Sequence, residues 1–205
     1  MRALLIVLAV FVALLAIAGG LVWWAFVARN TCVTLDEGAE RTLGDVDAQL
    51  QRRNDLVPNL VNAVKGSMGF ENKTLKEVIE ARSKVSQLNI SFKDATLNAE
   101  KMKEFAAAQS QLGGALSRLM AVVESYPDLK SAVTVRDLMT QLEGTENRIS
   151  VARQRYNEAI VEPNVWVRSP IGGIIANWAD LKHRTRFEAD KEAKTAPTVN
   201  LDFTK

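Results

Sequence analysis

The feature that most limits how this chain folds is an uncharged apolar run at its N-terminus. From residue 3 to residue 28 the sequence contains no charged side chain, and Arg29 ends the run. A helix of about 20 apolar residues crosses the hydrocarbon core of a bilayer, so this run can span a membrane with some tilt. Trp23 and Trp24 lie near its end, where aromatic side chains gather at a membrane interface. We therefore predict a transmembrane helix that contacts the lipid bilayer through residues 3–28.

A cleaved signal peptide is the alternative interpretation of the same run. Residues 16–18 resemble a cleavage site, but the apolar region of a signal peptide usually has only about 7 to 15 residues. Here the run continues well beyond residue 18, which favours an uncleaved, single-pass anchor. The basic residues on its two sides, Arg2 against Arg29 and Arg41, nearly balance, and the short basic start slightly favours export of the rest of the chain.

The composition excludes several classes of function. The 26 lysines and arginines nearly balance the 24 aspartates and glutamates, which leaves no basic surface for nucleic acid. Cys32 is the only cysteine and His183 the only histidine, so an internal disulfide, a two-cysteine zinc site and a ferritin-like di-metal site are excluded. No P-loop, Rossmann, GxSxG or HExxH pattern occurs. We therefore predict no catalysis, no cofactor and no bound metal.

After the anchor, apolar residues recur with a helical rhythm. Those between residues 39 and 64 are separated by alternating steps of four and three, the spacing of a coiled-coil seam. Thr34 and Glu37 have the spacing of a capping box, at which a new helix can begin. Pro58 falls inside the seam without changing its phase, which favours one kinked helix over two helices with Asn54 as the cap of the second.

Three further amphipathic helices follow in the sequence. They are predicted at about residues 72–88, 96–125 and 135–169, with a turn at residues 126–128 and a kink at Pro163. Short connections reverse the chain direction, so the predicted fold is all-α, with an N-terminal transmembrane helix followed by a long, coiled-coil-like antiparallel four-helix bundle. The predicted regions are the anchor, the bundle, an amphipathic segment and an extended or disordered tail, over residues 1–30, 31–169, 170–186 and 187–205.

The amphipathic segment has one apolar face. Its apolar side chains are Ile171, Ile174, Ile175, Trp178 and Leu181. In an antiparallel bundle the fourth helix returns to the end from which the first helix leaves the membrane, so we expect Trp166 and this segment near the lipid surface. Ile174 and Trp178 are then interfacial residues. A short helix packed on the end of the bundle, or a fifth core element, is the alternative.

Two polar motifs interrupt the apolar pattern. The first surrounds Pro58 and places Arg53 at an apolar position of the seam, with Arg52, Asp55 and Asn59 in a polar stripe beside it. The second motif lies on the fourth predicted helix. It contains Glu143, Gly144, Glu146, Asn147, Arg148, Arg153, Tyr156 and Asn157.

Each motif has a structural and a functional interpretation. In the structural one, both arginines of the first motif pair with acids of the fourth helix such as Glu146, and these pairs fix the choice and register of neighbouring helices. In the functional one, Glu143 and Asn147 point away from the seam and form a surface that a partner recognises. Gly144 supports the second interpretation, since a mid-helix glycine costs about 1 kcal/mol relative to alanine and leaves room for a close contact.

The chain resembles the bacterial LemA family. The matching segments are RRNDLVPNLVNAVKG, the alanine-arginine pair of IEARSKV, LGGALSRLMAVVESYPDLK, QLEGTENRISVARQRYNEA, and the late FEAD and APTVNLDF. This resemblance covers nearly the whole chain and implies a single-pass protein of the bacterial cytoplasmic membrane with a long four-helix bundle and no enzymatic activity. The segment RSPIGGIIANWADLKHRTRF and the residue Pro163 depart from the usual family pattern.

Three functional hypotheses agree with these predictions. The first is a membrane-anchored scaffold or adaptor that binds an unidentified protein. The second is a self-assembling coiled-coil protein that organises the membrane, and the third is a regulatory subunit of a membrane enzyme such as a protease. Crosslinking separates them, because self-only products favour assembly and a stable foreign partner favours an adaptor or a subunit.

Overall fold

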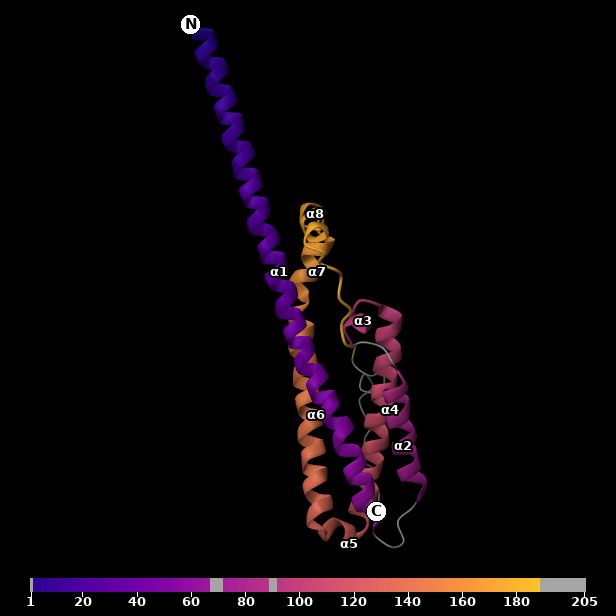
Figure 1. Cartoon of the computed structure of the whole chain (residues 1–205). Helices are drawn as coiled ribbons and strands as arrows, with labels where there is room; N and C mark the ends of the chain where they lie inside the picture. Colours follow the sequence, from indigo (N-terminus) through magenta and orange to yellow (C-terminus); the bar gives the residue numbers. More distant parts are fainter. Residues whose placement is uncertain (1, 67–71, 89–91, 189–205) are drawn as a thin grey trace, which may run out of the picture. The chain divides into compact units, whose positions relative to one another are not determined.

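Helices form every regular element in the part of the chain that the structure describes. The computed structural model describes residues 2–66, 72–88 and 92–188, and no strand occurs in these ranges (Figure 1). The helices are α1 (Arg2–Lys65), α2 (Asn72–Gln87), α3 (Phe92–Thr96), α4 (Ala99–Glu124), α5 (Pro127–Ser131), α6 (Val133–Ala159), α7 (Val161–Arg168) and α8 (Pro170–Trp178).

The predicted all-α class is therefore confirmed. The antiparallel order of the four bundle helices and the limits of the four predicted regions stay predictions. From residue 189 on, the predicted tail lies outside the described residues.

The chain forms two compact units. Among the described residues, the first comprises 2–50 and 148–184, and the second comprises those between 51 and 147 together with 185–188. The two long helices α1 and α6 each contribute residues to both units. Each unit has its own apolar core.

The helix α1 contains 64 residues without a break. Its apolar start is a candidate membrane span, and the rest of the chain buries none of that stretch. The predicted start of a new helix at Thr34 is wrong. Thr34 lies inside α1, where its hydroxyl donates to the carbonyl oxygen of Asn30 at 3.0 Å, as threonines in helix interiors often do, instead of capping a helix. Pro58 also lies inside α1, so a single helix crosses the proline, as predicted.

The second unit packs five helical segments around one apolar core. The core takes side chains from the end of α1, from α2, from α4, from α5 and from the start of α6, and α2 and α4 lie side by side (Figure 1). Leu60, Val78, Leu116 and Leu142 are among its almost completely buried members. Burying one such side chain contributes about 1.5 to 3 kcal/mol, so this core is the main source of the stability of the unit.

The ends of α4 differ from the prediction in two details. Asn98 caps α4, since its side-chain oxygen accepts hydrogen bonds from the backbone N–H groups of Glu100 and Lys101 at 2.9 and 3.2 Å. Thr96, the predicted start of this helix, ends the short helix α3 instead. The predicted turn at residues 126–128 leads into the short helix α5. Pro127 occupies the first position of α5, where a backbone N–H would have no partner within the helix, so the proline loses no hydrogen bond.

The fourth predicted helix is interrupted for one residue just before Pro163. α6 ends at Ala159 and α7 begins at Val161, so Pro163 lies in the first turn of a new helix. The N–H groups of the first helical turn have no partner within the helix, and a proline there loses no hydrogen bond. Ile160 keeps helical dihedral angles, φ −84° and ψ −5°, and its carbonyl accepts from the N–H of Asn164 at 3.1 Å, so the predicted kink at this proline stays a prediction.

The core of the first unit joins α8 to the part of α1 that follows the apolar run. It contains Ala28 and Cys32 of α1, Ile175 and Ala176 of α8, and Leu181. Residues 170–186, predicted to be amphipathic, thus pack partly against α1. Part of their apolar surface remains exposed, including the side chains of Ile171, Ile174 and Trp178.

Candidate functional site

Arg53 connects α1 to α4 and α6 inside the second unit. Its side chain occupies an apolar position of the seam and is only 2% exposed. Nη1 donates to Oε1 of Glu146 on α6 at 2.8 Å, and Nη2 donates to Oε1 of the buried Gln109 on α4. A buried guanidinium is tolerated only with such partners. The ion pair between Arg53 and Glu146 that the structural interpretation predicts is therefore present, and Gln109 is an additional partner.

A second polar contact compensates for the half-buried Pro58. Because proline has no N–H, the carbonyl of Asn54, four residues earlier, has no helical partner. Arg82 on α2 donates its Nε to that carbonyl oxygen at 3.3 Å. The proline thus leaves the Asn54 carbonyl of α1 without a helical donor, and Arg82 of α2 donates to it instead.

The other polar residues of the first motif face solvent. Arg52 and Asn59 are exposed and make no hydrogen bond or ion pair with another helix in the described part of the chain. Asp55 is also exposed, and it accepts a hydrogen bond at 2.9 Å from Gln51 of the same helix. The expected pairing of Arg52 with an acid of the fourth predicted helix is therefore wrong, since only the neighbouring arginine turns inward.

The second motif divides in the same way. Glu146 is half-buried and paired, whereas Glu143 and Asn147 are exposed and have no hydrogen bond or ion pair to another helix within the described ranges. Gly144 has open space beside it, because no atom lies within 4 Å of a Cβ added there. No close approach by another described residue therefore accounts for this glycine. Arg148 is exposed as well, and it belongs to the first unit.

We call five exposed residues of the second unit the outer polar set. They are Arg52, Asp55, Asn59, Glu143 and Asn147.

The last three residues of the second motif belong to the first unit and are not part of an open surface. Tyr156 is completely buried, and Arg153 and Asn157 are half-buried. Each of the three also takes part in at least one polar or ring contact. Their position fits a role in packing.

The residues predicted for the membrane interface lie on three helices of the first unit. Trp23 and Trp24 are exposed on α1, and Ile174 and Trp178 are exposed on α8. Trp166 on α7 is half-buried against the core that joins α8 to α1.

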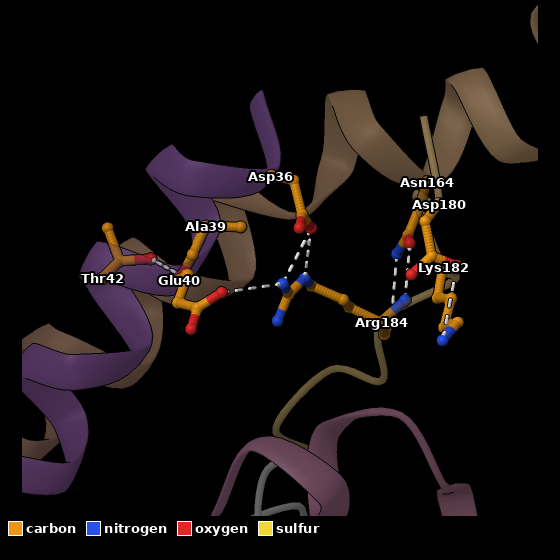
Figure 2. A network of polar contacts seen from close by, with 8 residues as sticks. All are labelled: Asp36, Ala39, Glu40, Thr42, Asn164, Asp180, Lys182 and Arg184. Atoms are coloured by element: carbon orange, nitrogen blue, oxygen red, sulfur yellow. Dashed lines mark hydrogen bonds and ion pairs between the residues drawn. The ribbon is translucent and has the colours of Figure 1, made fainter. Parts of the chain in front are cut away.

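A buried charge network in the first unit was not predicted (Figure 2). The guanidinium of Arg184 donates from Nε and Nη2 to one carboxylate oxygen of Asp36 at 3.0 and 2.7 Å, and Glu40 lies 3.8 Å from Nη2. Asn164 holds the backbone of the same residue, since its Oδ1 accepts from the N–H of Arg184 at 2.8 Å and its Nδ2 donates to the carbonyl at 2.9 Å. The network thus fixes the segment after α8 to both α1 and α7.

A sequence model of the LemA family matches residues 42–201 of the chain. This protein belongs to the LemA family. The match covers both polar motifs and most of the described helices, and it agrees with the resemblance that the motifs indicate.

Three bacterial relatives of the LemA-family chain illustrate the similarity. The chain is 26% identical over 185 residues to magnetosome protein MamQ 2 of Paramagnetospirillum magneticum, and 27% identical over 185 residues to magnetosome protein MamQ of Magnetospirillum gryphiswaldense. Both alignments cover 83% of this chain and 68% of the relative. The chain is also 23% identical over 173 residues to protein LemA of Metamycoplasma hominis, with 84% of this chain and 74% of the relative covered. Together with the apolar N-terminal helix, these relatives support a membrane-associated protein.

The described part of the LemA-family chain offers little for metal or thiol chemistry. No group of three or more histidine, cysteine, aspartate or glutamate side chains there is arranged to hold a metal ion. Cys32 has no exposed surface, and its burial raises the pKa of the thiol. The thiol therefore stays protonated and unreactive near neutral pH. The geometry offers instead the buried contacts of Arg53 with Glu146 and Gln109, and the exposed outer polar set.

Two contacts in the LemA-family chain were missed although each has a partial signal in the sequence. Arg82 belongs to an alanine-arginine pair that the resemblance singles out, and Pro58 predicts a free carbonyl on α1, but no rule of spacing connects the two. Asp36 and Glu40 are four residues apart and so lie on one helical face, yet their partner Arg184 is 148 residues beyond Asp36 in sequence.

Proposed function

We propose that this protein is a membrane-anchored helical adaptor of the bacterial cytoplasmic membrane, without catalytic activity of its own, that binds a protein partner through its outer polar set. α1 carries both the anchor and, nearer its C-terminal end, Arg52, Asp55 and Asn59, while Glu143 and Asn147 lie on α6. Surfaces of this kind recognise partners by hydrogen bonds and complementary charges.

The division of each polar motif into inner and outer residues is the observation that supports this proposal. Arg53 and Glu146 point inward and pair across helices, so their presence is explained by the fold. Arg52, Glu143 and Asn147 stand beside them but make no hydrogen bond or ion pair with another helix among the described residues. Polar side chains that do not support the fold are the ones available for recognition.

Crosslinking in intact cells that make the full chain tests the proposal. In the double variant Glu143→Ala, Asn147→Ala we expect the foreign crosslinked product to disappear while the thermal unfolding of the purified protein stays unchanged. The control is Lys76→Ala, Glu80→Ala, two exposed charges on α2, which should keep the product. Products that contain only copies of this chain, or a product that survives in the first variant, contradict the proposal. The first of these results would instead support self-assembly.

Gly144→Ala gives a second, independent readout. An added methyl group meets no atom of the chain, and alanine is about 1 kcal/mol more favourable than glycine inside a helix. We therefore expect higher stability together with weaker capture, because the methyl group would obstruct a partner that lies close to the α6 backbone. Higher stability with unchanged capture would show that the partner does not approach α6 at this position.

A further inference from the structure

An exposed apolar face extends along α7 and α8. Four of its residues are large and highly exposed: Val165 at 59%, Ile171 at 65%, Ile174 at 73% and Trp178 at 48%. Side chains of this size are usually covered when several of them cluster, and such a patch marks a contact with a partner or a membrane. We call these four residues the α7–α8 apolar face.

α8 packs against α1 immediately after the candidate membrane span. Ile175 and Ala176 bury Ala28 and Cys32. On the same side, Trp178 packs edge-to-face on Phe26, with 5.3 Å between ring centroids, and the guanidinium of Arg29 lies 5.3 Å from the Trp178 ring centroid. These contacts fix α8 beside residues 26–32, which is the level at which the apolar run ends.

A shallow apolar groove continues this face onto the span itself. It has a volume of about 230 Å³, and its lining consists of Trp24, Val165, Trp166, Ser169, Ile171 and Gly172. Trp24 is a residue of the predicted transmembrane run, while Val165 and Ile171 belong to the α7–α8 apolar face. One continuous apolar surface therefore runs from the span to α8.

We propose that the α7–α8 apolar face inserts into the headgroup and upper acyl region of the same bilayer that α1 crosses, with the groove filled by a lipid acyl chain. α7 and α8 then form a second, non-spanning membrane contact that holds α1 at a defined depth. Amphipathic helices in this position bury their apolar side about 5 to 10 Å into the interface.

Lipid, rather than a protein, is the occupant that the surroundings favour. Trp24 and Phe26 contact the bilayer if α1 spans it, and a groove that shares the Trp24 side chain opens into the same medium. Arg29 borders the face at Trp178, and an arginine side chain can extend to lipid phosphates while its apolar stem stays in the interface. Tryptophan side chains are enriched at the boundary between acyl chains and headgroups, and Trp178 lies there with the guanidinium of Arg29 over its ring.

Fluorescence of labelled full-length protein in phosphatidylcholine vesicles tests the proposal. Each variant carries Cys32→Ala and one new cysteine bearing an environment-sensitive nitrobenzoxadiazole group. The test position is Ile174→Cys; Val22→Cys, in the span, is the positive control, and Val133→Cys, exposed at the start of α6, is the negative control. Lipids with a nitroxide near the headgroup end of one acyl chain serve as the quencher.

We expect the label at residue 174 to emit at shorter wavelength than the label at residue 133 and to lose much of its emission to the nitroxide lipids, as the label at residue 22 does. An emission maximum equal to that of residue 133, without quenching, would show that the face is in water and would overturn the proposal. A shift to shorter wavelength without quenching would also overturn it, because a second copy of the chain would then cover the face. Since the vesicles hold only this protein and lipid, the three results are distinguishable, and none depends on the outer polar set.

Discussion

At the scale of single residues, Pro58 shows how a defect in one helix becomes a contact between two. The proline removes an N–H from α1, and Arg82 on α2 takes up the carbonyl of Asn54 that is left without a partner. A backbone acceptor without a partner is costly where water is excluded, so Arg82 offsets a cost that Pro58 creates. The two residues should therefore be energetically coupled although they do not bond to each other.

A double-mutant cycle tests this coupling. Arg82→Leu should lower the free energy of unfolding by about 1 kcal/mol, because the Asn54 carbonyl loses its donor. In a Pro58→Ala background the loss should be smaller, since the N–H of the new alanine can bond to that carbonyl, and the coupling energy should be about 0.5 kcal/mol or more. Chemical unfolding of the purified protein in detergent measures all four species.

The control for the cycle is Arg118→Leu. Arg118 on α4 makes an exposed ion pair with Glu77 on α2, at 3.2 Å, and has no contact with the Asn54 carbonyl. Its effect on the free energy of unfolding should be the same with proline or alanine at position 58. Equal losses for Arg82→Leu in the two backgrounds would contradict the role assigned to it.

At the scale of elements, the turn between α7 and α8 depends on one glycine. A Cβ added at Gly172 would lie 2.8 Å from the carbonyl oxygen of Trp166 and 2.1 Å from Oγ of Ser169. A serine hydroxyl can rotate away, but a backbone carbonyl cannot move without the helix it belongs to. Gly172 is therefore required for the close approach of α8 to the end of α7, and through it for the packing of α8 on Cys32.

Alkylation of Cys32 measures this packing directly, because it is the only cysteine of the chain. In the native protein the thiol is buried and its pKa is raised, so the reactive thiolate is scarce at neutral pH. Gly172→Ala should loosen α8, expose the thiol, return its pKa toward the ordinary value and speed its reaction with a maleimide. Gly44→Ala, at an open position of α1, should leave the rate unchanged. Equal rates in both variants would contradict the requirement for glycine at position 172.

The extent of individual helices shows most clearly what can and cannot be predicted from the sequence. The apolar rhythm between residues 39 and 64 predicts a helix that crosses Pro58, and α1 does so. The same rhythm cannot show whether a proline bends a helix or begins a new one, because both outcomes keep the phase. Pro163 illustrates this, since α6 ends at Ala159 and the proline lies in the first turn of α7.

At the scale of the whole molecule, sequence reasoning predicts the class of fold and the residues of the polar motifs, but not which of them pair. Arg52 and Arg53 are adjacent, and the structural interpretation expects both to pair with acids of the fourth predicted helix. Their side chains leave the helix about 100° apart, so only one can face α4 and α6. The network around Arg184 could not be predicted from the sequence. It joins segments that are distant in sequence, and none of these segments contains a recognisable motif.

The central claim is that the polar motifs are divided between support of the fold and recognition of a partner. Arg53 and Arg52 are a matched pair for testing it, since they are the same residue type at adjacent positions of one helix. The measurement is the free energy of unfolding of Arg53→Ala and Arg52→Ala in detergent, each paired with the yield of crosslinked partner in cells. Arg53→Ala leaves the buried Gln109 and the Glu146 carboxylate without their donor, so we predict a loss of about 2 to 3 kcal/mol. Arg52→Ala should change stability by less than about 0.5 kcal/mol and still reduce the yield. Equal destabilisation by both variants, or a full yield of partner with Arg52→Ala, would contradict the account.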